Sequence, residues 1–205
     1  MDELQSIIKM LSNSSNRIQM DFYSGKSSII DELKINEFSV LGNIIKHFSS
    51  ININSYLRLL GGNNNANNIL SFNKEIKLIY PGNKLVVAND IWGGIFAINN
   101  GDFDGEFRNI WYFAPDELQW INLNINYSQF ISWICSDKIN IFYKNFIWEN
   151  MNSIIDNISE NQAILIYPFL WSKECNIEKA DRSIVNLIEL IELNARYQKK
   201  FFGSI

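Results

Sequence analysis

The sequence predicts an α+β domain in which an antiparallel β-sheet meander packs against helices, with further helices at the N- and C-terminal ends of the chain. Short apolar runs separated by turn residues follow one another between residues 84 and 123. Strands joined by such short connections pair antiparallel with their neighbours in sequence. On both sides of this section, apolar residues recur three or four positions apart, which is the spacing of a helix face. No linker or internal repeat divides the chain, so we expect residues 1–205 to form a single domain.

Three helices and one strand are predicted before the meander. Residues 2–11 begin with an aspartate that can cap a helix and carry apolar residues at helical spacing. Residues 29–33 and 40–48 are compatible with helix or strand, and helix is the favoured interpretation for both. Residues 56–60 are typical of a strand. The Asn-rich tract at residues 63–68 is expected to be a surface loop, because Asn adopts turn conformations readily.

The meander and the elements after it are predicted from a change of period. Four strands are expected in the meander, at residues 84–88, 95–98, 109–113 and 118–123. The spacing then becomes helical, and Asn126 or Ser128 can cap the first helix. The expected elements are helices at 127–134, 139–146 and 148–158, a strand at 163–167 and a long final helix at 181–200.

Two pairs of adjacent glycines, Gly61-Gly62 and Gly93-Gly94, interrupt the predicted strands. Neither pair belongs to a phosphate-binding loop, because the chain contains no G-x-x-x-x-G-K motif and no G-x-G-x-x-G motif after a strand. We therefore expect both pairs to occupy turns whose backbone needs positive φ.

Composition and charge restrict the functional classes. With 18 Lys and Arg against 22 Asp and Glu, the chain has a net charge of −4 and a pI near 5.1. A nucleic-acid-binding protein usually carries a basic patch or stripe instead. The one dense group of cations, at residues 196–200, suits the C-terminal end of a helix. We therefore expect no nucleic-acid partner.

Three features of the sequence predict the cellular compartment. They are the cysteines, the first residues of the chain and the length of its apolar runs. Cys135 and Cys175, even together with the single histidine His47, do not supply a four-ligand zinc site. The first residues lack the basic and apolar regions of a signal peptide, and no apolar run reaches the ~18 residues of a membrane span. We therefore expect a cytoplasmic protein with free thiols, no metal or other cofactor and no membrane contact.

Carboxylates are the remaining chemistry that the chain offers, because catalysis by Ser-His-Asp or Cys-His needs a histidine and His47 is expected to be packed or at the surface. Six acids lie on or beside loops of the predicted meander: Asp90, Asp102, Asp104, Glu106, Asp116 and Glu117. Three interpretations stay open: a solvated acidic loop, an acidic face that binds a partner, or a pair acting as general acid and base. Residues 102–106 loosely resemble part of a calcium loop, but the final bidentate Glu and the flanking helices of an EF-hand are missing.

Trp92 completes the set of candidate binding residues, which are Asp90, Trp92, Asp102, Asp104, Glu106 and Asp116. It lies in a predicted turn, where it can either fold back onto the core or remain exposed as a contact residue. The exposed alternative is of interest because Trp is frequent at interface hot spots.

Four ordered blocks of sequence stand out: SYLRLLG at residues 55–61, DIWGGIFAIN at 90–99, WYFAPDELQW at 111–120 and YPFLW at 167–171. In this order they resemble a known bacterial family, the domain-of-unknown-function family 2625. They cover most of the chain from about residue 38 to residue 171, whereas the first forty residues and the Asn-rich tract match poorly. The family has no established activity.

The middle section is similar, more distantly, to the SUKH superfamily of Smi1/Knr4-like proteins. The similarity rests on the strand, Gly-Gly turn, strand, loop and strand that lead to an aromatic-containing helix at residues 127–133. Many members of that superfamily are bacterial immunity proteins that bind and neutralise toxins. The resemblance implies an antiparallel sheet packed against helices and a protein-binding role.

These observations favour a non-catalytic cytoplasmic protein-binding domain, including an immunity protein whose partner is a basic toxin. Opposite charge on such a partner would speed encounter. One alternative is a self-associating scaffold, in which aromatic residues such as Trp92 and Tyr112 form a homodimer face. The other is a carboxylate-dependent hydrolase, which requires two acids to converge in a cleft.

Overall fold

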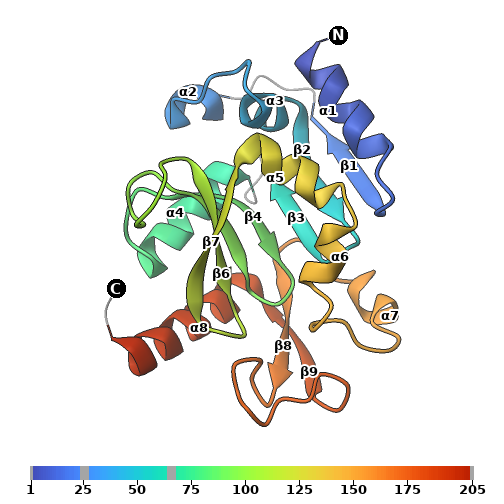
Figure 1. The fold of residues 1–205 in the computed structure, drawn as a ribbon, viewed down its shortest axis with the longest axis vertical. Helices are drawn as coiled ribbons and strands as arrows, with labels where there is room; N and C mark the ends of the chain where they lie inside the picture. The colour runs from blue at the N-terminus through green and yellow to red at the C-terminus, as the bar shows by residue number, and fades with distance from the viewer. Residues whose placement is uncertain (1, 24–27, 64–67, 204–205) are drawn as a thin grey trace.

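The computed structural model describes residues 2–23, 28–63 and 68–203 (Figure 1). In these residues a seven-stranded antiparallel sheet has the order β1-β2-β3-β4-β5-β6-β7, so each strand pairs with its neighbours in sequence. The strands are β1 (Ile18–Phe22), β2 (Phe48–Ile53), β3 (Leu57–Leu60), β4 (Leu85–Asp90), β5 (Ile95–Ile98), β6 (Asn109–Ala114) and β7 (Gln119–Asn126). The predicted α+β fold with an antiparallel meander is confirmed.

A two-stranded antiparallel hairpin, β8 (Gln162–Tyr167) and β9 (Asp181–Asn186), lies apart from the large sheet. The backbone amide of Ile164 donates a hydrogen bond to the carbonyl of Ile91, at 2.6 Å, and so joins the hairpin to the turn after β4. The helices are α1 (Glu3–Ser12), α2 (Ile29–Leu33), α3 (Val40–His47), α4 (Ile69–Ile79), α5 (Tyr127–Ile134), α6 (Lys138–Phe142), α7 (Asn152–Ile155) and α8 (Leu187–Phe202).

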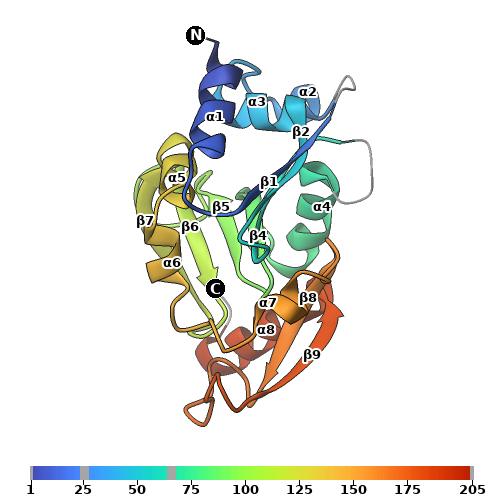
Figure 2. The ribbon, with the colours of Figure 1, turned by 90° about the vertical axis from the view of Figure 1, so that its right-hand side faces the viewer.

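Helices cover both faces of the middle of the sheet, with α5 and α6 on one side and α4 on the other (Figure 2). Phe96 and Tyr112 are register partners on β5 and β6 and share a face. Phe96 contacts Phe130 of α5 at 5.1 Å between ring centroids, and Tyr112 contacts Phe142 of α6 at 5.0 Å. Phe113 points to the opposite face because successive side chains of a strand alternate. The middle strands are therefore buried on both sides.

The end of the chain differs from the expectation of one helix over residues 181–200. Residues 181–186 form β9, and α8 begins only at Leu187. Pairing with β8 decides this, since Ala163 lies opposite Val185 in the hairpin. Asn186 then acts as the helix cap, because its side chain accepts hydrogen bonds from the amides of Ile188 and Glu189.

Two further expectations are corrected, and three elements of the structure were not predicted. The helical segments 139–146 and 148–158 contain only the short helices α6 and α7, joined by turns. The strands β1 and β2 and the helix α4 were not predicted. Helix α4 begins directly after the Asn-rich tract, and Asn68 caps it by accepting from the amides of Leu70 and Ser71 at 2.9 Å. Residues 64–67 of that tract lie outside the described residues.

The paired glycines are required by close packing more than by backbone dihedrals. Only Gly93, with φ 85°, has the positive φ that was expected of both pairs. A Cβ atom on Gly61 would lie 2.0 Å from the carbonyl oxygen of Phe48, and one on Gly62 would lie 2.1 Å from that of Ile45. The backbone after β3 thus passes directly against the connection between α3 and β2.

Substitution of Asn186 by alanine is expected to lower the free energy of unfolding by about 1 kcal/mol, because the first turn of α8 loses its cap. Urea unfolding of N186A measures this. The control is S183A on the exposed part of β9, which should be close to neutral. If a helix ran from residue 181, Asn186 would be in its interior and alanine would instead stabilise the protein.

Candidate functional site

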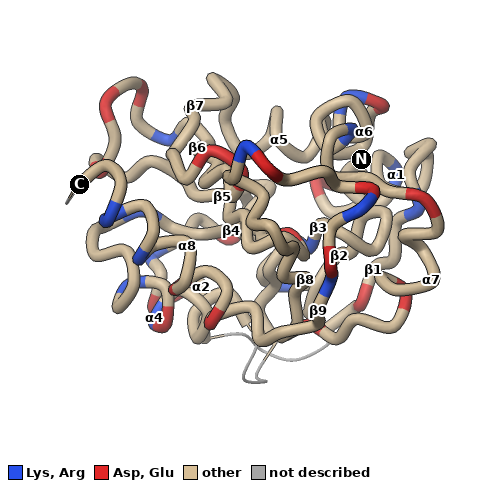
Figure 3. The backbone as a smooth tube through the Cα atoms, turned by 90° about the horizontal axis from the view of Figure 1, so that it is seen from below, with Lys and Arg blue, Asp and Glu red and all other residues tan. Residues whose placement is uncertain are grey.

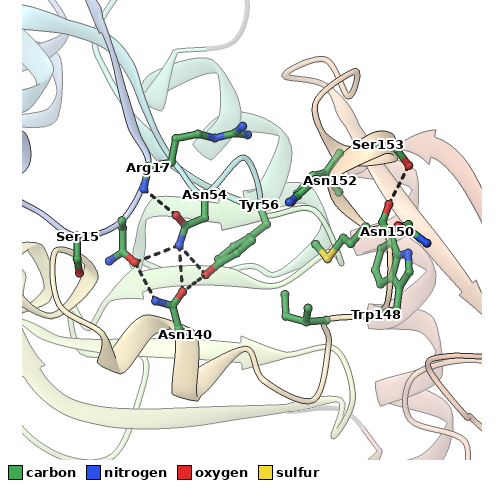
Figure 4. Close-up of a pocket in the computed structure, with 13 residues that line it drawn as sticks. Ser15, Arg17, Asn54, Tyr56, Asn140, Trp148, Asn150, Asn152 and Ser153 are labelled. Carbon is green, nitrogen blue, oxygen red and sulfur yellow. Dashed lines mark hydrogen bonds between the residues drawn. The ribbon is translucent and has the colours of Figure 1, made fainter.

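A pocket of about 760 Å³ opens between the start of β1, the turn that joins β2 to β3, and the segment from α6 to α7 (Figure 4). Its volume lies in the range of small-molecule and peptide-side-chain pockets, roughly 300–1,000 Å³. The lining is rich in carboxamides and hydroxyls: Ser15, Asn16, Asn54, Tyr56, Asn140, Asn150, Asn152 and Ser153. We call it the amide pocket.

Three asparagines and one tyrosine form a hydrogen-bonded cluster at one side of the amide pocket (Figure 4). The Asn54 amide nitrogen donates to the Tyr56 hydroxyl at 2.9 Å and to the Asn140 carbonyl oxygen at 3.1 Å. The Tyr56 hydroxyl also donates to Asn140, at 3.0 Å. The Asn140 amide nitrogen in turn donates to Asn16 at 2.9 Å. The cluster therefore fixes the orientation of each carboxamide.

The local sequence explains why Asn54 stands here. Asn54 and Ser55 have φ of 50° and 60°. The Tyr56 amide donates to the Ile53 carbonyl at 3.2 Å. Two positive φ values in a two-residue hairpin loop are typical of a type I′ turn, for which Asn is a favoured residue. The side-chain oxygen Oδ1 of Asn54 accepts a hydrogen bond from the backbone amide of Arg17 at 2.9 Å, which attaches the start of β1 to the same turn.

An ion pair lies next to the asparagine cluster, and buried apolar side chains form part of the pocket wall. Arg17 and Asp156 form a salt bridge and both are largely exposed. The hydrogen bond from Arg17 holds the pKa of Asp156 below its ordinary value. Trp148 and Met151 line the pocket and are buried, and the Arg182 guanidinium lies 4.6 Å from the centroid of the Trp148 ring.

Aromatic residues form the support beneath the amide pocket. The Tyr56 ring packs on Trp92, at 5.6 Å between centroids, and on Tyr143, at 4.9 Å. Trp92 and Tyr143 stack on each other at 5.1 Å. Trp92 is 1% exposed and Tyr112 is 2% exposed. Of the two alternatives for Trp92, the structure shows the one in which the turn residue folds back onto the core. Because Trp92 and Tyr112 are both buried, the expectation that they form an exposed homodimer face is wrong.

Asp90 anchors this support. Its Oδ1 accepts from the backbone amides of Trp92 and Gly94, at 2.9 and 2.8 Å. Its Oδ2 accepts from the hydroxyls of Tyr112 and Tyr143, at 2.8 and 2.9 Å. Gly94 is needed here because a Cβ would lie 2.2 Å from Oδ2. Asp90 is 1% exposed, so it holds the turn from beneath and does not face solvent.

Burial raises the pKa of Asp90 to about 6, although all four hydrogen bonds favour the ionised carboxylate and oppose this shift. Burial, and then the charge of Asp90, raise the pKa of Tyr112 and Tyr143 well above the ordinary value. Both phenols therefore remain protonated and able to donate to Asp90.

The other acidic residues predicted to bind a partner lie away from the amide pocket. Asp104 and Glu106 are exposed on the loop between β5 and β6. On the same loop, Asp102 accepts from Lys84 Nζ at 2.8 Å. This bond lowers the pKa of Asp102 against the opposing effect of partial burial. Asp116 is half-buried in the turn between β6 and β7, and burial raises its pKa.

The meander topology separates the predicted acids into two groups. Successive turns of an antiparallel meander lie at alternate ends of the sheet, so the loop carrying Asp102, Asp104 and Glu106 is opposite the turns of Asp90 and Asp116. Among the described residues, no group of three His, Cys, Asp or Glu side chains is placed to hold a metal ion. Cys135 and Cys175 are free.

The sequence interpretation missed the residues of the amide pocket, because the frequent asparagines resembled a compositional bias. The one local signal was Asn54-Ser55 between two apolar runs, which is compatible with a type I′ hairpin turn. Asn16 and Asn140 are 124 residues apart and carry no signal that joins them.

Comparison with known proteins identifies the family. Residues 1–190 match the model of the family described as Protein of unknown function DUF2625. The chain belongs to this family. The match includes the first forty residues, which the resemblance seen in the sequence did not cover.

Two uncharacterised bacterial proteins are similar in sequence to this chain. YbfG of Escherichia coli is 35% identical over 117 residues, which are 57% of this chain and 53% of YbfG. A Haemophilus influenzae protein is 27% identical over 166 residues, 78% of this chain and 70% of that protein. The chain therefore spans only about half of the length of YbfG. No solved structure matches the chain.

Within the described residues, no helix is both long and apolar enough to span a membrane.

The charge of Asp90 makes a testable contribution to stability. Its pKa is about 6 in the folded protein, against 3.8 for an unperturbed aspartate, so between these pH values the folded protein binds more protons than the unfolded chain. This contribution to the free energy of unfolding is largest below about pH 4 and falls by about 3 kcal/mol as the pH rises past 6.

Comparison of D90N with the native chain isolates this effect, because the amide does not titrate. From pH 4 to pH 7 we expect the difference in free energy of unfolding between the two proteins to shift by roughly 2.4 kcal/mol in favour of the variant, because the unfolded aspartate is already partly ionised at pH 4. Urea unfolding at both pH values provides the measurement. A difference that does not change with pH would show that Asp90 ionises normally in the folded protein.

Proposed function

We propose that this chain is a non-catalytic binding domain for another protein, and that the amide pocket holds a segment of that partner. The observation that carries the proposal is the fixed cluster of Asn16, Asn54, Asn140 and Tyr56 at the pocket wall. The cluster forms a rigid wall, because its amide groups donate mainly to one another and to the backbone. Beside it the carboxamides of Asn150 and Asn152 also line the pocket, and each offers one acceptor and two donors, which complement the carbonyl and amide groups of a peptide backbone. The apolar Ile147, which is 38% exposed at the rim, provides contact for a side chain.

The state of the carboxylates favours binding over hydrolysis. A carboxylate-dependent hydrolase needs a general acid and a general base that both reach the substrate. Asp90 is enclosed beneath the pocket, and Asp156, which does not line the pocket, is paired with Arg17. Asp102 is held by Lys84 on a loop at the other end of the sheet.

The overall charge favours a basic partner. The chain carries a net charge of −4, and the exposed acids Asp104 and Glu106 lie on one loop. Lys and Arg are interspersed with Asp and Glu along the backbone, so the attraction to a basic partner comes from the net charge of −4 (Figure 3). Charge complementarity of this kind speeds association more than it strengthens a complex.

The finer form of the proposal is an immunity protein that neutralises a basic toxin in the cytoplasm. It is supported by the acidic balance and by the resemblance of the middle section to the SUKH superfamily. In this form the partner is a protein and not a nucleic acid or a membrane.

Co-purification from the native host tests the function. A tagged chain is expected to recover one protein in stoichiometric amount, identified by mass spectrometry. N152E should weaken that complex at least about tenfold, because it places a charge where the partner would displace water from neutral amides. N145E is the matched control, since Asn145 is also exposed but does not line the amide pocket.

Reversal of the loop charges gives an independent readout. The double variant D104K/E106K should slow association and reduce its dependence on salt, whereas E174K/E189K, on other exposed segments, should do so less. A chain that always purifies alone, or a complex that tolerates N152E as well as N145E, would reject the amide pocket as the binding site.

Self-association is the second candidate function, and exposed aromatic residues near the C-terminal end of α8 favour it. Tyr167 is 60% exposed, Phe201 49% and Phe202 57%. Phe201 also contacts Trp171, at 5.2 Å between ring centroids. If this surface forms a homodimer, sedimentation should give a dimer that F201S/F202S converts to a monomer. A native monomer at micromolar concentration would exclude this candidate.

A further inference from the structure

A second cavity, of about 560 Å³, lies away from the amide pocket. The connection between α2 and α3 forms one wall, the ends of β4 and β5 form the floor, and the loop before β6 and the first residues of α5 form the remaining wall. These elements belong to the end of the molecule that carries α2, α3 and α5 (Figure 1). We call it the α2–α5 cavity.

The body of the α2–α5 cavity is apolar. Leu41 and Ile98 are each 8% exposed, and Leu85 is half-buried beside them. Phe107 stands at the edge with 60% of its surface exposed. Side chains of this kind gain free energy when an apolar group replaces the water against them.

One residue of the cavity lining carries a buried polar group that has no partner among the described residues. Tyr127 lines the cavity and is 7% exposed, yet its hydroxyl is buried without a hydrogen bond from any described residue. A buried hydroxyl that lacks a partner costs stability, so such groups are normally paired. A ligand that accepts a hydrogen bond would satisfy it.

The charged residues that line the cavity are Lys34 and Arg108, and both are cations. Neither belongs to an ion pair within the part of the chain that the structure describes.

Two acids on or beside the neighbouring helix α2 form ion pairs with other lysines, whereas Asp31 of α2 belongs to none of the ion pairs of the described residues. Glu37 accepts from Lys46 at 2.7 Å, and Glu32 pairs with Lys74 at 3.3 Å. Lys34 and Arg108 are exposed and form no ion pair with these two acids, so both can attract an anion from solution.

We infer that the α2–α5 cavity binds a small carboxylic acid with an apolar body. The apolar body would lie against Leu41, Leu85 and Ile98, and the carboxylate would accept a hydrogen bond from Tyr127. Arg108 and Lys34 would neutralise its charge, since Arg presents donors in a planar fork that matches a carboxylate. This site is separate from the amide pocket and does not depend on the function proposed for it.

Calorimetric titration with octanoate tests the inference, with octan-1-ol and inorganic phosphate as comparison ligands. Octanoate is expected to bind saturably, and octan-1-ol and phosphate at least about tenfold more weakly, because each lacks one half of the recognised chemistry. R108Q and K34Q should each weaken octanoate binding several-fold, whereas K173Q, at an exposed lysine outside the cavity, should not.

Tyr127→Phe separates a ligand-binding role from a structural one. If the hydroxyl serves a ligand, the variant should unfold at the same or a higher temperature than the native chain without octanoate, and should bind octanoate about tenfold more weakly. A lower unfolding temperature with unchanged affinity would overturn the inference. So would equal affinities for octanoate and octan-1-ol, equal affinities for octanoate and phosphate, or no saturable binding of octanoate.

Discussion

The arrangement of this protein depends on one buried carboxylate. Asp90 joins three parts of the chain, because its four donors come from the turn after β4, from Tyr112 on β6 and from Tyr143 after α6. Hydrogen bonds in such a low-dielectric interior are strong when made and costly when missing. The positions of Trp92 and Tyr143, and through them that of Tyr56 in the amide pocket, follow from this interaction.

Secondary-structure elements could be predicted where residues close together in the sequence determine them without help from distant parts of the chain. Helix α5 was predicted with its bounds and a cap, since Asn126 and Gln129 form a capping box that is legible in the sequence. The strand β2 was missed because Phe48 follows helix α3 without a break. The strand β9 was mistaken for helix because Ile184 continues the spacing of the α8 face across Asn186, and only pairing with β8 decides between the two.

The candidate site was harder to predict than the fold. Asp90 and Trp92 were recognised as unusual turn residues, but a sequence does not show how deeply a turn is buried. Both support the amide pocket from within. The pocket itself is assembled from asparagines that are distant in sequence, and each of them alone is indistinguishable from the many others in the chain.

The sequential order of the large sheet has a consequence for how the chain is made. Because each strand pairs with the one before it, the sheet can assemble progressively while a ribosome adds residues. Tyr112 follows Asp90 by 22 residues and Tyr143 by 53, so the sheet is fully translated before the second phenol is synthesised. In the nascent protein the Asp90 carboxylate therefore remains hydrated at one corner of the sheet. It is buried only after Tyr143, in the segment beyond α6, has emerged from the ribosome.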